Sequence, residues 1–288
     1  MLPIFLTSIK TRDHVTLDGI VAEPKRKKGT ALIWIHGLSS RFSSGQTLTR
    51  ELSTACQKNG WGYVKFNTRG HDIINRDGAK TKKLHGAGFE KFSDCVQDVR
   101  AMVQFAKRRG FKKIILAGHS TGANKALYYI YKTCDRSMKG LVLIAPISDR
   151  AIAIKKHGAP AIARGLRIAK ALKKRKAPLM PIQFGIISPA RYQSLSAPST
   201  AEDVFPYHNL RARWKELRSV HTPIAVIVGN KDQYLDRTAR QLIEIFRANA
   251  HSTTSFTGSI ITGANHGFQK KEQRLTTAIM TFIQRAIV

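Results

Sequence analysis

The 288-residue sequence is poor in acidic residues, in cysteine and in long apolar runs. Its three cysteines, Cys56, Cys95 and Cys134, form no Cys-x-x-Cys or Cys/His pattern, which excludes a disulfide scaffold and a zinc finger. Reduced thiols are typical of a cytosol-like compartment. The N-terminus lacks a basic segment followed by a signal-length apolar stretch, and no run reaches the ~20 apolar residues of a membrane helix. We therefore expect a cytoplasmic protein with no membrane span.

The shortage of acidic residues leaves a large excess of positive charge. There are 18 Asp and Glu residues against 49 Lys and Arg residues, so the formal net charge is +31. Such a charge attracts polyanions through its long-range field. The basic residues form no single tract and are not interleaved with aromatic side chains, as in proteins that stack bases. We expect no specific nucleic-acid partner.

Apolar residues make up 42% of the chain, enough for a core, and they follow an alternating pattern of strands and helices. Short apolar runs predict strands at residues 5–10, 14–23, 30–35, 62–66, 112–117, 140–145, 224–228 and 259–261. Helical spacing predicts helices at residues 47–58, 92–109, 123–133, 237–248 and 272–286. Strands that alternate with helices predict an α/β fold, with a mainly parallel sheet covered by helices on both faces.

This alternation stops between residues 149 and 219, where helix-like basic segments are followed by five prolines, at residues 178, 181, 189, 198 and 206. We therefore predict a core formed by residues 1–148 and 220–288 and a cap inserted at residues 149–219. One apolar helix side in the cap is predicted to lie on the sheet; it carries Ile162, Leu166, Ile168, Ala169 and Leu172. The same helix should turn its basic residues outward; these are Lys170, Lys173, Lys174, Arg175 and Lys176.

The clearest chemical motif is Gly118-His119-Ser120-Thr121-Gly122, which fits G-x-S-x-G between a predicted strand and a predicted helix. The small residues on either side of the serine let the backbones pass closely, so a strained turn can present Ser120 above the sheet edge. The backbone N–H of Thr121 then faces the same space, at the start of the helix. We predict that Ser120 is a nucleophile.

A serine nucleophile needs a base and a group that orients the base. His266 follows the last predicted strand, which is where the chain order Ser–acid–His places the base. Asp232 follows the preceding strand and is the first choice for the acid. Asp236, four residues on, and Asp149, after the strand at 140–145, are the alternatives. Asp236 is also suited to a helix N-terminus.

The strand at residues 30–35 ends in His36-Gly37-Leu38, where glycine lets the chain turn toward the serine. The backbone N–H of Leu38 is expected to form an oxyanion hole with that of Thr121. His36 is expected to form structural hydrogen bonds. The sequence has no HExxH motif, no clustered carboxylates and no phosphate loop, so we expect neither a metal nor an organic cofactor.

These motifs together resemble the α/β-hydrolase superfamily: His36-Gly37, Gly118 to Gly122, Gly229-x-x-Asp232 and His266-Gly267 each lie at the expected strand end. A narrower set resembles the branch that includes fungal siderophore esterases; it comprises Gly118 to Ala123, Ala145 to Arg150, Ala190 to Leu195 and Glu202 to Phe205. The resemblance implies a serine hydrolase that cleaves a small-molecule carboxylic ester through an acyl-enzyme. An aminopeptidase or amidase, an acyltransferase and a non-catalytic binding module are the alternatives.

Overall fold

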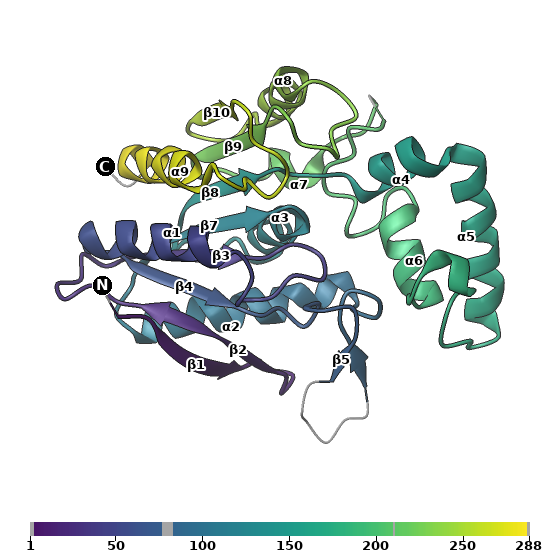
Figure 1. The fold of residues 1–288 in the computed structure, drawn as a ribbon, viewed down its shortest axis with the longest axis horizontal. Coiled ribbons are helices and arrows are strands. Elements are labelled where there is room, and N and C mark those ends of the chain that lie inside the picture. Colours follow the sequence, from purple (N-terminus) through teal and green to yellow (C-terminus); the bar gives the residue numbers. More distant parts are fainter. Residues whose placement is uncertain (1–2, 77–82, 210, 287–288) are drawn as a thin grey trace.

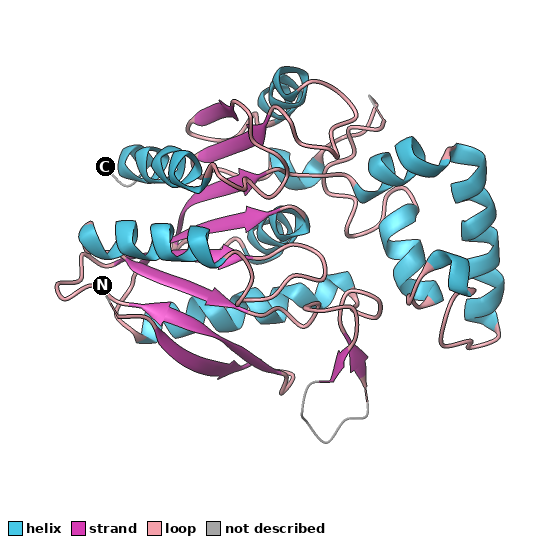
Figure 2. Cartoon of the chain, in the orientation of Figure 1, coloured by secondary structure: helices cyan, strands magenta, loops and turns pink. Residues whose placement is uncertain are grey.

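The structure is a computed structural model that describes residues 3–76, 83–209 and 211–286. Its centre is an eight-stranded sheet in the order β1-β2-β4-β3-β7-β8-β9-β10 (Figures 1 and 2). The strands are β1 (Phe5–Lys10), β2 (Thr16–Ala22), β3 (Thr30–Ile35), β4 (Gly62–Phe66), β7 (Lys113–His119), β8 (Met138–Ile144), β9 (Ile224–Gly229) and β10 (Phe256–Ile261). β2 is antiparallel to both of its neighbours, and the remaining pairs are parallel. The prediction of a mainly parallel sheet is confirmed.

Helices cover both faces of this sheet, as the alternating pattern predicted. The core helices are α1 (Gln46–Lys58), α2 (Cys95–Arg108), α3 (Thr121–Thr133), α7 (Lys215–Arg218), α8 (Ala239–Asn249) and α9 (Glu272–Ala286). α1 and α9 pack on one face, with Leu32 and Trp34 of β3. α2, α3 and α8 pack on the other face, with Ile33 and Ile35. Alternate residues of one strand thus enter different cores, because successive side chains point to opposite faces.

Most predicted elements end within two residues of the observed ones, and the structure departs further from the prediction at three places. β10 begins at Phe256, three residues earlier than predicted, because Phe256 pairs with Ile224 of β9. The first turn of the helix predicted at residue 92 is a separate 3-10 turn, η1 (Phe92–Asp94). The sequence did not predict the two-stranded antiparallel sheet formed by β5 (Asn75–Arg76) and β6 (Leu84–His85).

After β8 the chain leaves the sheet and forms α4 (Asp149–His157), α5 (Ala159–Lys174), η2 (Ile182–Phe184) and α6 (Pro189–Ser196). These helices stand beside the core, beyond the carboxyl ends of the parallel strands (Figure 1). The prediction that α5 lies on the sheet is wrong. Its apolar side packs against Met180 and Tyr192 in a small separate core. A Cβ at Gly165 would lie 2.2 Å from the Tyr192 hydroxyl oxygen, so only glycine allows α5 and α6 this close approach.

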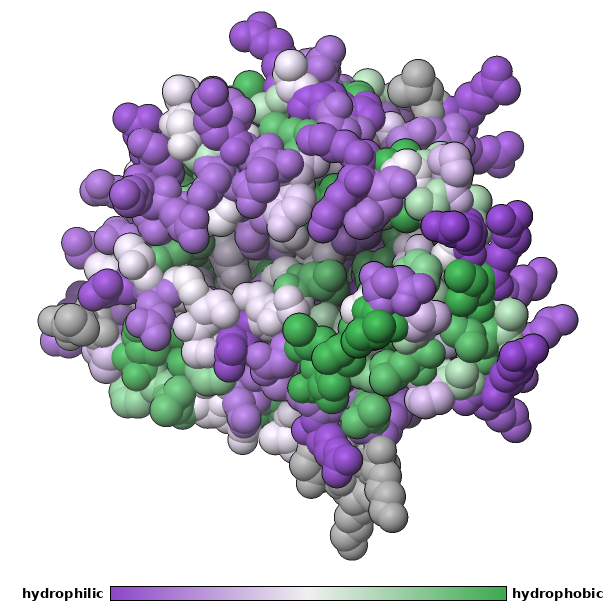
Figure 3. All heavy atoms as spheres, turned by 45° about the vertical axis from the view of Figure 1, so that its right-hand side comes forward, coloured by the Kyte–Doolittle hydropathy of each residue, from purple (hydrophilic) through white to green (hydrophobic). Residues whose placement is uncertain are grey.

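Apolar side chains also gather on the surface where these helices meet the core (Figure 3). The exposed apolar residues here are Ile73 and Ile74 of the core and Ile186 of the segment between α5 and α6. Residues 86–88 lie between the core and the α4–α6 segment. An added Cβ at Gly86 would touch Ile73 of the core, and one at Gly88 would touch Ile186 of the segment. The Ser188 N–H also donates to the Gly88 carbonyl, at 2.9 Å. The α4–α6 segment is thereby tied to the core through backbone contacts.

Candidate active site

Ser120 stands in the tight turn between β7 and α3, at the carboxyl edge of the sheet. Its φ of 56° and ψ of −128° place a non-glycine residue in the left-handed half of conformational space, which costs free energy. The Ser120 N–H donates to the Ile144 carbonyl of β8, at 2.9 Å, and this bond holds the strained turn against the sheet. Backbone strain of this kind is typical of functional sites.

The glycines of the motif have no room for a side chain. A Cβ at Gly118 would lie 2.2 Å from the Gly122 carbonyl oxygen, and one at Gly122 would lie 2.2 Å from the Ile35 carbonyl oxygen. The turn is therefore wedged between β3 and its own helix. Gly37 is close on the other side, because a Cβ there would lie 3.0 Å from the Ser120 Cβ and 3.4 Å from its Oγ.

His266 and Asp232 are in direct contact. Nδ1 of His266 lies 2.8 Å from Oδ2 of Asp232, and both residues are buried. The other carboxylate oxygen of Asp232 accepts from the Tyr234 N–H at 2.9 Å, which fixes the carboxylate plane. The Tyr234 ring stands edge-on to the imidazole, with centroids 4.7 Å apart. The Asp232 carboxylate thus favours a proton on Nδ1 and leaves Nε2 as the acceptor.

His119, the variable residue of the motif, ties the histidine loop to the serine turn. Its Nε2 lies 2.8 Å from the His266 carbonyl oxygen, and the two rings have centroids 4.9 Å apart. Burial and the neighbouring His266 lower the pKa of His119 to about 4, so its ring is neutral and donates through Nε2. The sequence pattern does not predict a role for His119, because only the fold shows which loop this residue contacts.

The backbone N–H groups of Leu38 and Thr121 have no hydrogen-bond acceptor within the described part of the chain. Thr121 is fully buried at the start of α3, where the first amides have no intrahelical partner. Leu38 follows Gly37, which lies against Ser120. His36 fixes this loop: its Nε2 accepts from the Thr68 N–H at 2.8 Å, so Nδ1 donates to the Gly37 carbonyl. Burial and the Lys125 charge lower the pKa of His36 to about 3.

Asp236 and Asp149, the other two candidates for the group that orients the base, lie in different surroundings from Asp232. Asp236 forms an ion pair with Arg237, at 2.8 Å. Asp149 begins α4, and its Oδ2 is buried without a hydrogen-bond partner in the described residues. Burial and the charge of Glu202 raise the pKa of Asp149. Among the three candidates, the structure places Asp232 in contact with His266.

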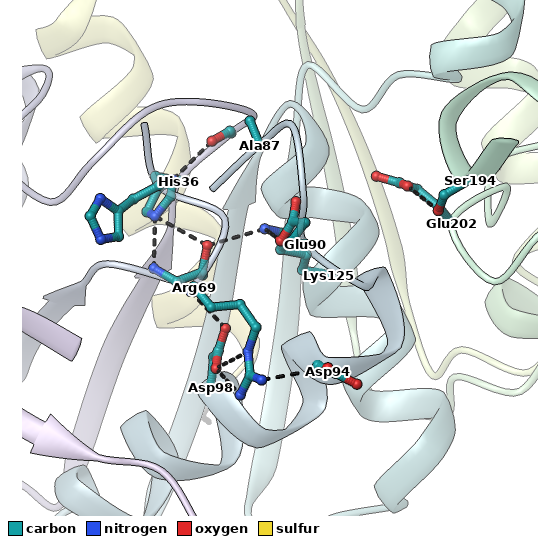
Figure 4. A network of polar contacts seen from close by, with 12 residues as sticks. His36, Arg69, Ala87, Glu90, Asp94, Asp98, Lys125, Ser194 and Glu202 are labelled. Carbon is teal, nitrogen blue, oxygen red and sulfur yellow. Dashed lines mark hydrogen bonds and ion pairs between the residues drawn. The ribbon is translucent and has the colours of Figure 1, made fainter. Parts of the chain in front are cut away.

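A buried network of charged groups connects the loop beside the site with the α4–α6 segment. The Lys125 amine of α3 bonds to Glu90 at 2.8 Å and to the Thr68 hydroxyl at 3.1 Å. Arg191 of α6 joins Glu90, at 3.0 Å, to Glu202, whose carboxylate also accepts from Ser194. Figure 4 shows Lys125 directed at Glu90, and Ser194 beside Glu202. The residues are far apart in sequence, so no local pattern could have revealed the network.

A second group of charges braces the loop after β4. Arg69 is 1% exposed; its backbone N–H and its guanidinium both donate to Asp98 of α2, each at 2.9 Å. The guanidinium also pairs with Asp13 at 2.7 Å and lies 3.6 Å from Asp94 (Figure 4). A guanidinium is well suited to several carboxylates because its donors form a planar fork. These contacts fix the start of the loop Arg69-Gly70-His71-Asp72.

In residues 3–76, 83–209 and 211–286, no group of three or more His, Cys, Asp or Glu residues is arranged to hold a metal ion. No helix in this part of the chain has the length and apolar character needed to cross a membrane. The cysteines in these ranges are free thiols; Cys56 and Cys95 are buried and Cys134 is exposed.

The chain has the α/β-hydrolase fold, as defined by the sheet order, the crossover helices and the strained serine turn. Solved structures of esterases have a similar fold. An esterase of Pyrococcus furiosus, Pf2001, is 19% identical over 100% of this chain and 92% of its own, with a TM-score of 0.65. Est1E from Butyrivibrio proteoclasticus, solved with ferulic acid, is 17% identical over 98% and 99%, with a TM-score of 0.61. A carboxyl esterase of Bacillus coagulans is 13% identical over the whole of both chains, with a TM-score of 0.68.

Within this fold, the chain belongs to the family described as "Protein of unknown function (DUF1749)", whose model matches residues 6–287. No curated protein matches the sequence.

Proposed function

We propose that the protein hydrolyses carboxylic esters with Ser120 as nucleophile, His266 as base and Asp232 as the group that orients the base. One observation carries the proposal: Ser120 stands in a strained turn that His119 ties to a His266–Asp232 pair. The same arrangement of roles recurs in serine hydrolases of unrelated folds. The names of the three structural neighbours, which are all esterases, favour an ester over an amide.

In this mechanism the Ser120 Oγ attacks the ester carbonyl while the Nε2 atom of His266 takes the hydroxyl proton. The carbonyl oxygen becomes an oxyanion, which accepts from the free N–H groups of Leu38 and Thr121. When the intermediate collapses, the C–O bond to the alcohol breaks and His266 returns the proton to the leaving oxygen. Water then attacks the acyl-enzyme by the same route and releases the acid. Asp232 stabilises the imidazolium in both steps.

We further propose that residues 149–219 act as a cap on a core of residues 1–148 and 220–288, and that the substrate is a small ester. The buried Arg191–Glu90 pair supports a cap fixed against the core. The apolar surface at this junction, which includes Ile73, Ile74 and Ile186, would suit the hydrocarbon part of an ester. The cytoplasmic location inferred from the cysteines stays a prediction.

The test is hydrolysis of p-nitrophenyl esters of increasing acyl length, together with feruloyl esters and amino-acid amides. The wild-type protein should hydrolyse at least one ester, and Ser120→Ala should abolish this turnover. Ser8→Ala, at an exposed position of β1, is the matched control and should retain full activity. Turnover of amides without esters would favour the amidase alternative, and turnover that survives Ser120→Ala would contradict the proposed mechanism.

A further inference from the structure

A cavity of about 570 Å³ lies between the loop that leads into α1 and the loop that follows β10. This volume is in the range of small-molecule sites. The residues that line the cavity include Lys65, His119 and Thr49. Gly37 and Gly267 line it as well, so it adjoins the proposed triad, although neither Ser120 nor His266 forms its wall. The proposed mechanism does not use this space.

Lys65 is a buried cation without an acidic partner. It lies in β4, is 3% exposed, and its amine donates to the Ser44 carbonyl at 2.6 Å and to the Thr49 hydroxyl at 2.9 Å. Both acceptors are neutral, and no described carboxylate lies within 4 Å of the amine, the limit for an ion pair. Glu272 lines the same cavity but forms no ion pair with Lys65. Buried charges are normally paired, because an isolated charge loses its hydration.

The amine also meets the positive end of a helix. α1 begins after Gly45, which supplies no side-chain cap, and its first turn has no acidic residue. The N–H groups of Gln46, Thr47 and Leu48 have no hydrogen-bond acceptor in the described part of the chain, and all three residues line the cavity. A helix N-terminus carries partial positive charge and attracts anions. A cation placed there is unfavourable unless a negative group lies between the two.

We propose that this cavity binds a carboxylate or phosphate group, held by the Lys65 amine and the first-turn N–H groups of α1. An anion there would accept charge-assisted hydrogen bonds from the ammonium and complete the first turn of the helix. The two histidines on the cavity wall, His36 and His119, are neutral and leave Lys65 as the cation of the site. The bound anionic group is either part of an ester substrate or a free anion. The first of these alternatives rests on the proposed function.

Binding is measured by calorimetric titration with inorganic phosphate at pH 7 and constant ionic strength. The Ser120→Ala protein is used beside the wild type, so that the result does not depend on turnover. Saturable binding is expected in both proteins. Lys65→Met should weaken it at least tenfold, whereas Lys58→Met, at the exposed end of α1, should leave it unchanged. Equal affinity in the wild type and Lys65→Met would overturn the proposal.

A second variant keeps the test valid if Lys65→Met fails to fold. Gln46→Glu places a carboxylate in the exposed first turn of α1, in the lining of the same cavity, and should raise the melting temperature and block phosphate binding. Gln273→Glu, in the exposed first turn of α9, is the matched control. It should gain the ordinary stabilisation of an acid at a helix N-terminus but leave phosphate binding intact. Phosphate binding that Gln46→Glu leaves unchanged would contradict the proposed site.

The source of the anion is identified with two p-nitrophenyl esters of equal chain length, the glutarate half-ester and the neutral pentanoate. If the anion belongs to the substrate, Lys65→Met should lower kcat/KM at least tenfold for the half-ester and little for the pentanoate. If it is a free anion, Lys65→Met should change kcat/KM for both esters by the same factor, and so should added phosphate. A protein that binds phosphate through Lys65 but hydrolyses no ester would contradict the proposed function and not this site.

Discussion

Asp232 and Asp149 both follow a strand of the sheet, but they lie in different surroundings. Asp232 holds the His266 imidazole, whereas Asp149 lies near Glu202 with an oxygen that has no partner. We predict that Asp232→Asn lowers kcat by about 10³–10⁴-fold, because the amide favours the wrong imidazole tautomer. Asp149→Asn should change kcat less than about threefold. Steady-state kinetics of both variants decide the assignment, and a larger loss in Asp149→Asn would reverse it.

Lys65 gives a prediction for the pH dependence of stability. Burial lowers its pKa from 10.5 to about 8, so between these values the unfolded chain binds more protons than the folded chain. The free energy of unfolding should therefore rise with pH across this window, by roughly 2–4 kcal/mol for this group. Urea denaturation at pH 7.5 and 10 measures it as the difference between the wild type and Lys65→Met. A difference that does not change with pH would contradict the assigned environment.

The sequence could predict the residues whose position in the fold is set by a strand end. Ser120, Asp232 and His266 each follow a parallel strand, and parallel strands end at one edge of the sheet. Lys65 could not be predicted in this way. In the sequence, Lys65 is one polar residue within a short strand. The cavity that it lines is formed by loops from two distant parts of the chain, which no local pattern brings together.

The α4–α6 segment depends on Arg191 for its attachment to the core. Arg191 is 1% exposed and is bonded to Glu90, Glu202 and the Ala87 carbonyl. Arg191→Met should lower the free energy of unfolding by about 3–5 kcal/mol, because it leaves buried carboxylates without their partner. Arg167→Met, exposed on α5, is the matched control and should change it by less than about 0.5 kcal/mol. Similar urea midpoints for the two variants would contradict this role.

The basic run of α5 is predicted to have little influence on catalysis. Lys173 and Lys174 are exposed, as the sequence predicted, and α5 stands away from the sheet. At physiological salt, charges beyond about 8 Å are largely screened. Changing both lysines to glutamate should leave kcat/KM for a neutral ester within about threefold, at low and at physiological salt. A tenfold loss confined to anionic esters would instead make this run a gate that selects charge.

α5 also shows a limit of reading a helix from its periodicity. The apolar side of residues 162–172 was correctly identified, but the pattern does not specify which surface will cover it. Tyr192 and Met180 cover it, and the small residues Gly165 and Ala169 let them approach. A helix that buries such a narrow side can pack on another helix as well as on a sheet.

In the molecule as a whole, acidic residues are few, and some of them lie in the interior. Among the described residues, five of them are buried: Glu90, Asp98, Glu202, Glu216 and Asp232. The acidic residues that remain at the surface are too few to pair with most of the 49 basic residues. The resulting field concentrates small anions around the protein, which favours the cavity at Lys65. The absence of a specific nucleic-acid partner stays a prediction from the sequence.

The central claim is that Ser120 is an activated nucleophile, and a fluorophosphonate probe tests it most directly. Only a serine with an adjacent base attacks the probe's phosphorus and displaces fluoride. Mass spectrometry of the labelled wild-type protein should find one adduct, on the peptide that contains Ser120. Labelling should be lost in Ser120→Ala, slowed strongly in Asp232→Asn and unchanged in Ser8→Ala. An unlabelled wild-type protein, or a label on another serine that persists in Ser120→Ala, would contradict the account.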